Sequence, residues 1–438
     1  MARALRRPRT RPVLRRPPGI GWRPHRTHPK GDHVLDDALL ARIHDRAAEI
    51  DRSNGFPWED LEDLREAGYF TAMVPSERGG GGLSLREMTE VQMRLAGAAP
   101  ATALAFNMHQ IWVGVANTMA TMGDTSADFL LDAAMDREIF AFGVSEPGND
   151  LVLFGSASEA RPDGEGGYSF HGTKIFTSGA PAWTMLGTYA QDSTDPENPR
   201  SVYAFVRRDG GGFEIRDDWD ALGMRGSQSC TTILDGAHAP AERILGTFPP
   251  GPGMEPVLFG IFSNFEILVA SVYVGIARRA LDLAVETVHR RRSRLNLGAP
   301  YANDPLIRRR IAEAAIALDG IYPQIASIAD DVADFSLERH GDLWYPRLSA
   351  ILGRSVEVAK EVVEQAVRSA GGSSYYTKNE LSRLYRDVLA GLFHPSDSES
   401  LTNAWAGAVL GPVLPWPPAP EAEAGAAEAG TPEDREES

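Results

Sequence analysis

Chemically active side chains gather near the C-terminal end of the chain, where residues 384–397 read LYRDVLAGLFHPSD. Arg386 and Asp387 form a charged pair, and His394 is followed directly by Pro395. An imidazole titrates near neutral pH and is suited to moving a proton, whereas proline cannot continue a helix. The stretch therefore has two interpretations. His394 is either part of a reactive site or a surface histidine that closes a helix.

Two other segments, GVSEPG at 143–148 and GTKIFTSG at 172–179, end candidate strands in polar turns. Free backbone N–H groups and hydroxyls in such turns can hydrogen-bond the edge of a flat heterocycle, and an aromatic ring can lie against its face. Either segment alone is an ordinary turn. Together they indicate a binding site for a flat cofactor.

Other kinds of chemistry find little support. The 10 histidines are scattered without the spacing of metal ligands, and no Gly-x-Ser-x-Gly nucleophile elbow occurs. Cys230 is the only cysteine, so a disulfide within the chain and a multi-cysteine metal site are excluded. This cysteine usage fits the reducing cytoplasm, which is the expected location.

Charge is unevenly distributed along the 438 residues. The net charge is −16, yet the first 30 residues hold nine arginines, one lysine and no acid. The rest of the chain is therefore strongly acidic, which argues against nucleic acid as a partner. We expect a disordered basic arm at 1–32 and a disordered acidic tail, rich in Pro, Ala and Glu, at 415–438.

Between these ends the periodicity of apolar residues changes twice. Helical spacing over 33–138 gives way to short alternating runs over 139–247, and helical spacing returns over 248–414. The pattern predicts an α+β protein with an N-terminal helical domain, a middle β-barrel or sandwich and a C-terminal four-helix bundle. The longest apolar run, 267–277, is too short to span a bilayer, so no membrane partner is expected.

Five ordered motifs carry a resemblance to a known family. They are LREAGYFTAMVPSERGGGGLSLREMTEV, GVSEPG, GTKIFTSGAPA, ALGMRGSQSCTTILDGAHAPAERILG and the pair RSAGGSSYY with LYRDVLAG. In this order they resemble the N-terminal helical segment, the two flavin-edge turns, the end of the β domain and the bundle motifs of acyl-CoA dehydrogenases. The resemblance covers about residues 35–412.

The resemblance implies a flavoprotein that is a homo-oligomer, a dimer or tetramer, with FAD (alternatively FMN) between the β domain and the bundle. It places Arg294, Arg368, Gly371 and Gly372 beside the cofactor of a neighbouring subunit, although the two glycines also suit a helix C-terminus. By position, the residues expected at the flavin in the same subunit are Phe142, Val144, Ser145, Phe176 and Ser178.

The chain departs from the family pattern where the reaction needs a base. In the dehydrogenases a glutamate removes the α-proton of an acyl thioester while a hydride passes to flavin N5. Its most frequent position falls on Pro395, beside His394. An alternative position on the first bundle helix falls on Phe265, next to Glu266. His394 and Glu266 are therefore the two candidate catalytic residues. Arg368 in place of Gln and Leu297 in place of Phe are further departures.

Three functions remain open from the sequence. The leading hypothesis is α,β-desaturation of an acyl-CoA, with an electron-transfer partner that reoxidises the flavin. The alternative is a monooxygenase that uses reduced flavin, supplied by a flavin reductase, and O₂, and that needs no α-proton acceptor. The third is a flavoprotein that has lost catalysis and serves in binding or assembly.

Overall fold

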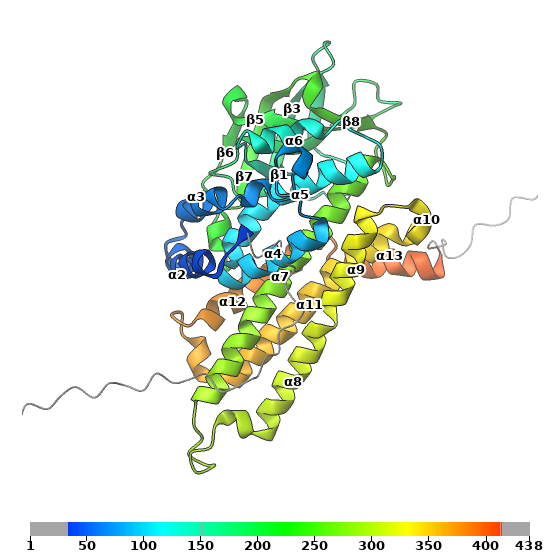
Figure 1. The fold of residues 1–438 in the computed structure, drawn as a ribbon. Helices are drawn as coiled ribbons and strands as arrows, with labels where there is room; N and C mark the ends of the chain where they lie inside the picture. The colour runs from blue at the N-terminus through cyan, green and yellow to red at the C-terminus, as the bar shows by residue number, and fades with distance from the viewer. Residues whose placement is uncertain (1–33, 150, 152, 412, 414–438) are drawn as a thin grey trace, which may run out of the picture.

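A computed structural model describes residues 34–149, 151, 153–411 and 413; the basic arm expected at 1–32 and the acidic tail expected at 415–438 lie outside the described residues. The described chain passes from helices through one eight-stranded sheet to a long helical bundle (Figure 1). The predicted α+β class is confirmed.

The N-terminal helices are organised around α5, which begins with Pro100 and is buried almost all round. Its neighbour α4 starts with a capping box, in which the Ser84 and Glu87 side chains each accept a backbone N–H of the other residue. These helices contact both the sheet and the bundle. Their bounds are α2 (Asp37–Ser53), α3 (Trp58–Glu66), α4 (Leu85–Ala98), α5 (Pro100–Thr121) and α6 (Asp128–Met135).

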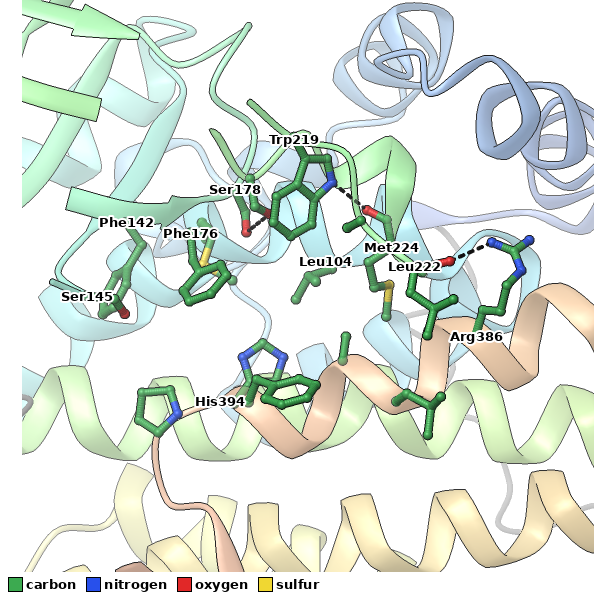
Figure 2. A pocket seen from close by; sticks show the side chains of 18 of the residues that line it. Leu104, Phe142, Ser145, Phe176, Ser178, Trp219, Leu222, Met224, Arg386 and His394 are labelled. Carbon is green, nitrogen blue, oxygen red and sulfur yellow. Dashed lines mark hydrogen bonds between the residues drawn. The ribbon is translucent and has the colours of Figure 1, made fainter. Parts of the chain in front are cut away.

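The middle region is a sheet with the strand order β6-β7-β3-β2-β4-β5-β8, and β1 pairs in parallel with β4. Most other pairs are antiparallel, and β3 and β7 lie side by side along nearly their whole length. The strands are β1 (Phe140–Gly143), β2 (Glu159–Pro162), β3 (Tyr168–Thr177), β4 (Met185–Asp192), β5 (Arg200–Arg207), β6 (Phe213–Ile215), β7 (Cys230–Ala239) and β8 (Ile244–Phe248). The turns that end β1 and β3 face the bundle (Figure 2).

The C-terminal bundle is built on α7, which runs along its whole length between α4, α5 and α11 (Figure 1). The apolar stretch is longer than the run at 267–277 indicated, since by length and composition α7 could cross a membrane. However, 94% of its most apolar window is buried within the protein. Its apolar composition is that of a core helix. The bundle contains α7 (Pro256–Arg290), α8 (Pro305–Asp319), α9 (Ile321–Ala333), α10 (Leu337–His340), α11 (Trp344–Ala370), α12 (Glu380–Val388) and α13 (Ser398–Leu410).

A buried ion pair fixes the turn after β1. Lys174 on β3 donates to Glu146 Oε1 (2.5 Å) and to the carbonyl oxygen of Tyr189 (2.6 Å), and both charged side chains are fully enclosed. Burial alone would raise the pKa of Glu146, but Lys174 and the hydroxyl of Ser156 bring it down to about 2. Burial lowers the pKa of Lys174 to about 8. Both groups are therefore charged at neutral pH, and they hold Ser145 in place.

A second set of contacts joins all three regions of the chain and is referred to below as the three-domain clamp. The Arg386 guanidinium on α12 donates to Asp51 Oδ1 on α2 (2.9 Å) and to the carbonyl oxygen of Leu222 (2.8 Å). The next residue, Asp387, accepts the backbone N–H of Met224 (2.7 Å). The β6–β7 loop is so close to α12 that a Cβ at position 223 would collide with the Arg386 carbonyl oxygen, which explains the glycine there.

We predict that Lys174→Met lowers the free energy of unfolding by about 3–5 kcal/mol, because it leaves the Glu146 carboxylate buried without its counter-charge. The double variant Lys174→Met with Glu146→Gln should be less destabilised than the single one. Urea unfolding at a fixed flavin concentration measures both. Equal stability of the single and double variants would contradict a charged pair at this position.

We also predict a pH-dependent difference in stability between the wild type and Asp387→Asn. Burial raises the pKa of Asp387 to about 6, although the Met224 N–H partly opposes this. The folded state therefore holds this proton more tightly than the unfolded state does. The resulting stabilisation is complete below pH about 4 and is lost as the pH rises to about 6.

The reference is Asp387→Asn, whose amide oxygen can still accept the Met224 N–H. Relative to this variant, the wild type should lose at most about 1.4 kcal/mol of stability per pH unit between pH about 4 and about 6, with no further change at higher pH. Urea unfolding in buffers from pH about 4 to about 8 tests this. A difference that stays constant with pH would show that Asp387 is ionised throughout.

Candidate active site

A cavity of about 250 Å³ opens where the β domain, α5 and the bundle meet (Figure 2). Its walls are mostly aliphatic and aromatic, and its few polar groups lie at separate points. The described residues that line it are Leu104, Met108, Phe142, Ser145, Phe176, Ser178, Trp219, Ala221, Leu222, Gly223, Met224, Ser229, Phe265, Arg386, Leu389, Ala390, Phe393, His394 and Pro395.

Two aromatic pairs line the walls. Phe176, the residue before the polar end of β3, has a φ of +57° and is half exposed, and its ring meets Trp219 edge to face with ring centres 6.2 Å apart. On another wall Phe142 stacks on Phe265 with ring centres 5.3 Å apart. A positive φ is costly for a bulky residue and is typical of functional sites. The backbone thus presents the Phe176 ring to the cavity and not to the core.

Hydroxyl groups mark one edge of the cavity. Ser178 Oγ lies 2.8 Å from Ser229 Oγ, which lies 2.8 Å from Ser227 Oγ. The turn after β1 is tied to β3 because Ile175 N–H donates to the carbonyl oxygen of Ser145 (2.9 Å). Aromatic walls with hydroxyls at an edge suit a tricyclic heterocycle that has polar atoms on its rim. The residues present therefore fit an isoalloxazine ring, held by Phe176 and Trp219 and oriented by Ser145 and Ser178.

His394 lies on the opposite side of the cavity from Phe176 (Figure 2). Its Nε2 is 2.6 Å from the hydroxyl oxygen of Tyr273, a core residue of α7. Burial lowers the pKa of His394 to about 4, so the ring is neutral at neutral pH. Burial likewise raises the pKa of Tyr273 well above its usual range, so its hydroxyl keeps its proton.

The tautomer of His394 follows from hydrogen-bond satisfaction. Among the described residues the Tyr273 hydroxyl has no acceptor other than His394 Nε2, and a buried hydroxyl requires one. Tyr273 therefore donates to Nε2, and the imidazole proton resides on Nδ1. The cavity is thus lined by a neutral imidazole with a fixed N–H donor.

The structure does not bring Glu266 to the cavity. Its side chain is 1% exposed and lies inside the bundle, where Oε1 accepts a hydrogen bond from the Ser396 hydroxyl. Burial raises the pKa of Glu266 well above its usual range despite this bond, so the carboxyl group is neutral. A single step along α7 separates Phe265, on the helix face that lines the cavity, from Glu266, on a face that points into the core.

Other expected cofactor residues lie elsewhere in the single chain. Val144 is buried behind the wall and does not line the cavity. Arg294 is exposed after α7, and Arg368 is exposed near the end of α11, where it pairs with Glu364. Gly371 and Gly372 follow α11, and Gly371 ends the helix with a φ of +77°. Phe142, Ser145, Phe176 and Ser178 do line the cavity.

Sequence reasoning missed about half of the lining. Leu104 and Met108 are spaced four apart on α5 and look like ordinary core residues. Trp219 stands in a loop, and only its isolation between strands could have drawn attention to it. Leu222 and Met224 belong to a motif that the resemblance had already singled out, but no role had been attached to them.

No carboxylate lines the cavity among the residues that the structure describes. Asp150, which follows the turn after β1, lies outside the described residues. The titratable lining groups are His394 and Arg386, and Arg386 is held in the three-domain clamp.

Comparison with known proteins gives matches along the whole described chain. Models of the acyl-CoA dehydrogenase N-terminal, middle and C-terminal domains match residues 34–126, 141–237 and 267–398. The chain is 31% identical over 376 residues to the L-evernosamine nitrososynthase of Micromonospora sp., covering 83% of this chain and 86% of the relative. It is 26% identical over 388 residues to the putative acyl-CoA dehydrogenase YdbM of Bacillus subtilis, covering 83% and 93%.

Among solved structures, KijD3 in complex with FMN and dTDP-3-amino-2,3,6-trideoxy-4-keto-3-methyl-D-glucose has a TM-score of 0.77 at 28% identity and covers 88% of this chain and 95% of that one. The fold is also that of butyryl-CoA dehydrogenase from Megasphaera elsdenii, with a TM-score of 0.74. With its three domains matched in order and a relative 31% identical across most of its length, the chain belongs to the acyl-CoA dehydrogenase family, whose members are flavoproteins.

Proposed function

We propose that the protein is a monooxygenase that uses reduced flavin and O₂ to oxidise a small molecule. The observation that carries this proposal is the set of side chains in the cavity: a neutral imidazole at His394 and, among the described residues, no carboxylate. Desaturation of an acyl thioester requires a base positioned to remove the α-proton. Oxygen transfer has no such requirement.

The names of the relatives also support oxidation of a small molecule by a flavin enzyme. The nitrososynthase of Micromonospora sp. is 31% identical, and the KijD3 structure contains FMN together with a dTDP-linked amino sugar. Relatives named as dehydrogenases also match, at lower identity. We take a nucleotide-linked amino sugar as the first substrate class to examine, and FMN as the first flavin.

A reduced flavin bound in the cavity supplies the electrons with which O₂ is activated for transfer of one oxygen atom. The chain's own groups prepare the site for that chemistry. Phe142, Phe176 and Trp219 supply apolar surface against which a bound ring would pack in place of water. The hydroxyls of Ser145 and Ser178 orient the polar edge of the bound ring. His394 holds one proton on Nδ1, fixed in direction by the bond from Tyr273 to Nε2.

The reductant and the oligomeric state follow as parts of the proposal. A flavin reductase would supply the reduced cofactor. A homo-oligomer would account for Arg294, Arg368, Gly371 and Gly372, which lie away from the cavity of their own chain and which the family resemblance assigns to a neighbouring subunit. Light scattering coupled to size-exclusion chromatography reports the state.

We predict that anaerobic mixing with acyl-CoAs of several chain lengths leaves the visible band of the bound oxidised flavin unchanged, because no described group of the cavity can take the α-proton. Dithionite, as the control, should bleach the band.

With a flavin reductase, NADH and O₂ present, a dTDP-linked amino sugar should gain oxygen, as read by mass spectrometry. Bleaching by any acyl-CoA would restore the dehydrogenase hypothesis. A flavin that is reduced and reoxidised without product from a broad substrate panel would favour the catalytically inactive flavoprotein.

We predict that His394→Ala lowers kcat by about 10²-fold or more while bound flavin is retained, since a positioned proton donor contributes about 10²–10⁴-fold. Tyr273→Phe should give a smaller loss, because the imidazole remains but its tautomer is no longer fixed. Glu266→Gln is the matched control, since its side chain lies outside the cavity and its amide can still accept from Ser396. A loss with Glu266→Gln as large as that with His394→Ala would move the proton-handling role to Glu266.

A further inference from the structure

A second cavity, of about 880 Å³, lies beside the flavin cavity and is referred to below as the basic cleft. It is formed by α2, the β6–β7 loop and the start of α12. Ala221, Leu222 and Arg386 line both cavities, so the two are neighbours across a common wall. The remaining lining residues are His44, Asp45, Ala48, Asp51, Arg52, Arg225, Thr377, Lys378, Asn379, Glu380 and Arg383.

Positive charge dominates the basic cleft, although the chain as a whole carries −16. Its cationic lining residues are Arg52, Arg225, Lys378, Arg383 and Arg386, and His44 can add a further charge, whereas its acids are Asp45, Asp51 and Glu380. The acids are largely compensated within the protein. Asp51 pairs with Arg386, and Glu380 binds Arg279 through two hydrogen bonds of 2.8 Å. Arg52 pairs with Glu49 and Arg225 with Asp220, so among the described residues the unpaired positive charge of the cleft lies on Arg383 and Lys378.

Arg383 is the least satisfied of these cations. It is only 6% exposed, and its Nε and Nη2 atoms are buried without a hydrogen-bond partner among the described residues. Its nearest carboxylate oxygen, on Glu380, is 3.8 Å from Nη2, which is too far for a hydrogen bond. A buried guanidinium with unpaired N–H groups is costly. An anion that enters the cleft would supply the missing acceptors.

Lys378 stands at the mouth of the same cleft. Its side chain is exposed, and it makes no ion pair with the residues that the structure describes. An ammonium at the rim attracts an anion, while a planar guanidinium deeper in the wall can bind two of its oxygens at once. The two cations are thus placed for successive contact with one multivalent anion.

We propose that the basic cleft binds a phosphate or diphosphate group of a ligand whose other end lies in the flavin cavity. Arg383 and Lys378 recognise the phosphate oxygens, and the ligand passes over Leu222, whose side chain is exposed at the border between the two cavities. The placement of that other end rests on the proposed function. The phosphate contact itself does not.

Two sources can supply the phosphate, and they are separable by binding. In one the group belongs to the flavin, and in the other it belongs to a second, phosphorylated molecule such as a nucleoside-diphosphate-linked substrate. Riboflavin and FMN differ only in the phosphate, so their affinities for flavin-free protein identify the first source. Binding of inorganic pyrophosphate or dTDP to protein already saturated with FMN identifies the second.

The test measures affinity by isothermal titration calorimetry on the full chain, with Arg383→Met and Lys378→Met compared with the wild type. Arg309→Met serves as the matched control, because Arg309 is exposed on α8 and pairs with Glu313 outside the cleft. Loss of a charged hydrogen bond to phosphate should weaken binding at least about 10-fold with Arg383→Met and less with Lys378→Met. Rising salt should weaken wild-type binding. Arg383→Lys should recover part of the affinity.

Weaker binding of FMN with riboflavin unchanged in Arg383→Met would support the proposal with the flavin as the source. Weaker binding of pyrophosphate or dTDP to FMN-saturated protein would support it with a second ligand as the source. The proposal is overturned if the wild type binds neither pyrophosphate nor dTDP and FMN binds no more tightly than riboflavin. It is also overturned if affinities in both cleft variants equal those of Arg309→Met.

If Arg383→Met fails to fold, the wild-type titrations and Lys378→Met, a change at the exposed rim, still decide the question. None of these measurements requires turnover. Failure of the monooxygenase assay with intact phosphate binding would therefore reject the proposed function and leave the cleft assignment standing.

Discussion

The three-domain clamp is the contact on which both cavities depend. Arg386 and Asp387 are adjacent on α12, yet they hold different partners: Asp51 on α2 and Leu222 for the first, and the Met224 backbone for the second. Asp51 comes from the N-terminal helices, whereas Leu222 and Met224 both come from the β6–β7 loop. These bonds fix the β6–β7 loop against α12, while the bonds from Asn54 to Trp219 and from Arg225 to the carbonyl oxygen of Asp51 fix it against α2. The loop supplies the wall shared by the flavin cavity and the basic cleft.

The clamp carries an electrostatic cost that is distributed unequally. Arg386 is compensated, because the Asp51 carboxylate binds it through two nitrogens. Asp387 is compensated less: it is 2% exposed, its described hydrogen-bond partner is a backbone N–H, and the charges of Arg383 and Arg386 offset only part of its burial. Burial therefore raises its pKa to about 6. Arg383, one turn earlier on α12, also lacks partners, because its Nε and Nη2 atoms have no acceptor among the described residues. Of these three side chains of α12, only Arg386 therefore has a full carboxylate partner among the described residues.

The fold and part of the site could be predicted from the sequence because both depend on short segments of the chain. Alternating runs and helical stripes identified the regions, and turns such as GVSEPG and GTKIFTSG carry their own hydrogen-bonding groups, so Ser145, Phe176 and Ser178 were found. The contribution of Trp219 depends on how its loop is placed against α12. The separation of Phe265 from Glu266 depends on the rotation of α7 about its axis. These are tertiary facts with no local signal. Arg383 was missed for the same reason, because an unpaired cation is recognised only when its neighbours are known.

His394 and Pro395 stand where the acyl-CoA dehydrogenases most often have their glutamate base. This difference changes which proton transfers the cavity can support. An imidazole whose pKa is held at about 4 by burial is a weak base, poorly matched to removing a carbon-bound proton near neutral pH. The same burial that weakens it as a base stabilises it as a neutral donor, because Tyr273 satisfies Nε2 and leaves the proton on Nδ1. A site lined by such a group can hold a hydrogen bond to a reacting atom through a range of pH without changing its own charge. That property suits oxygen transfer better than desaturation, on a fold that serves both.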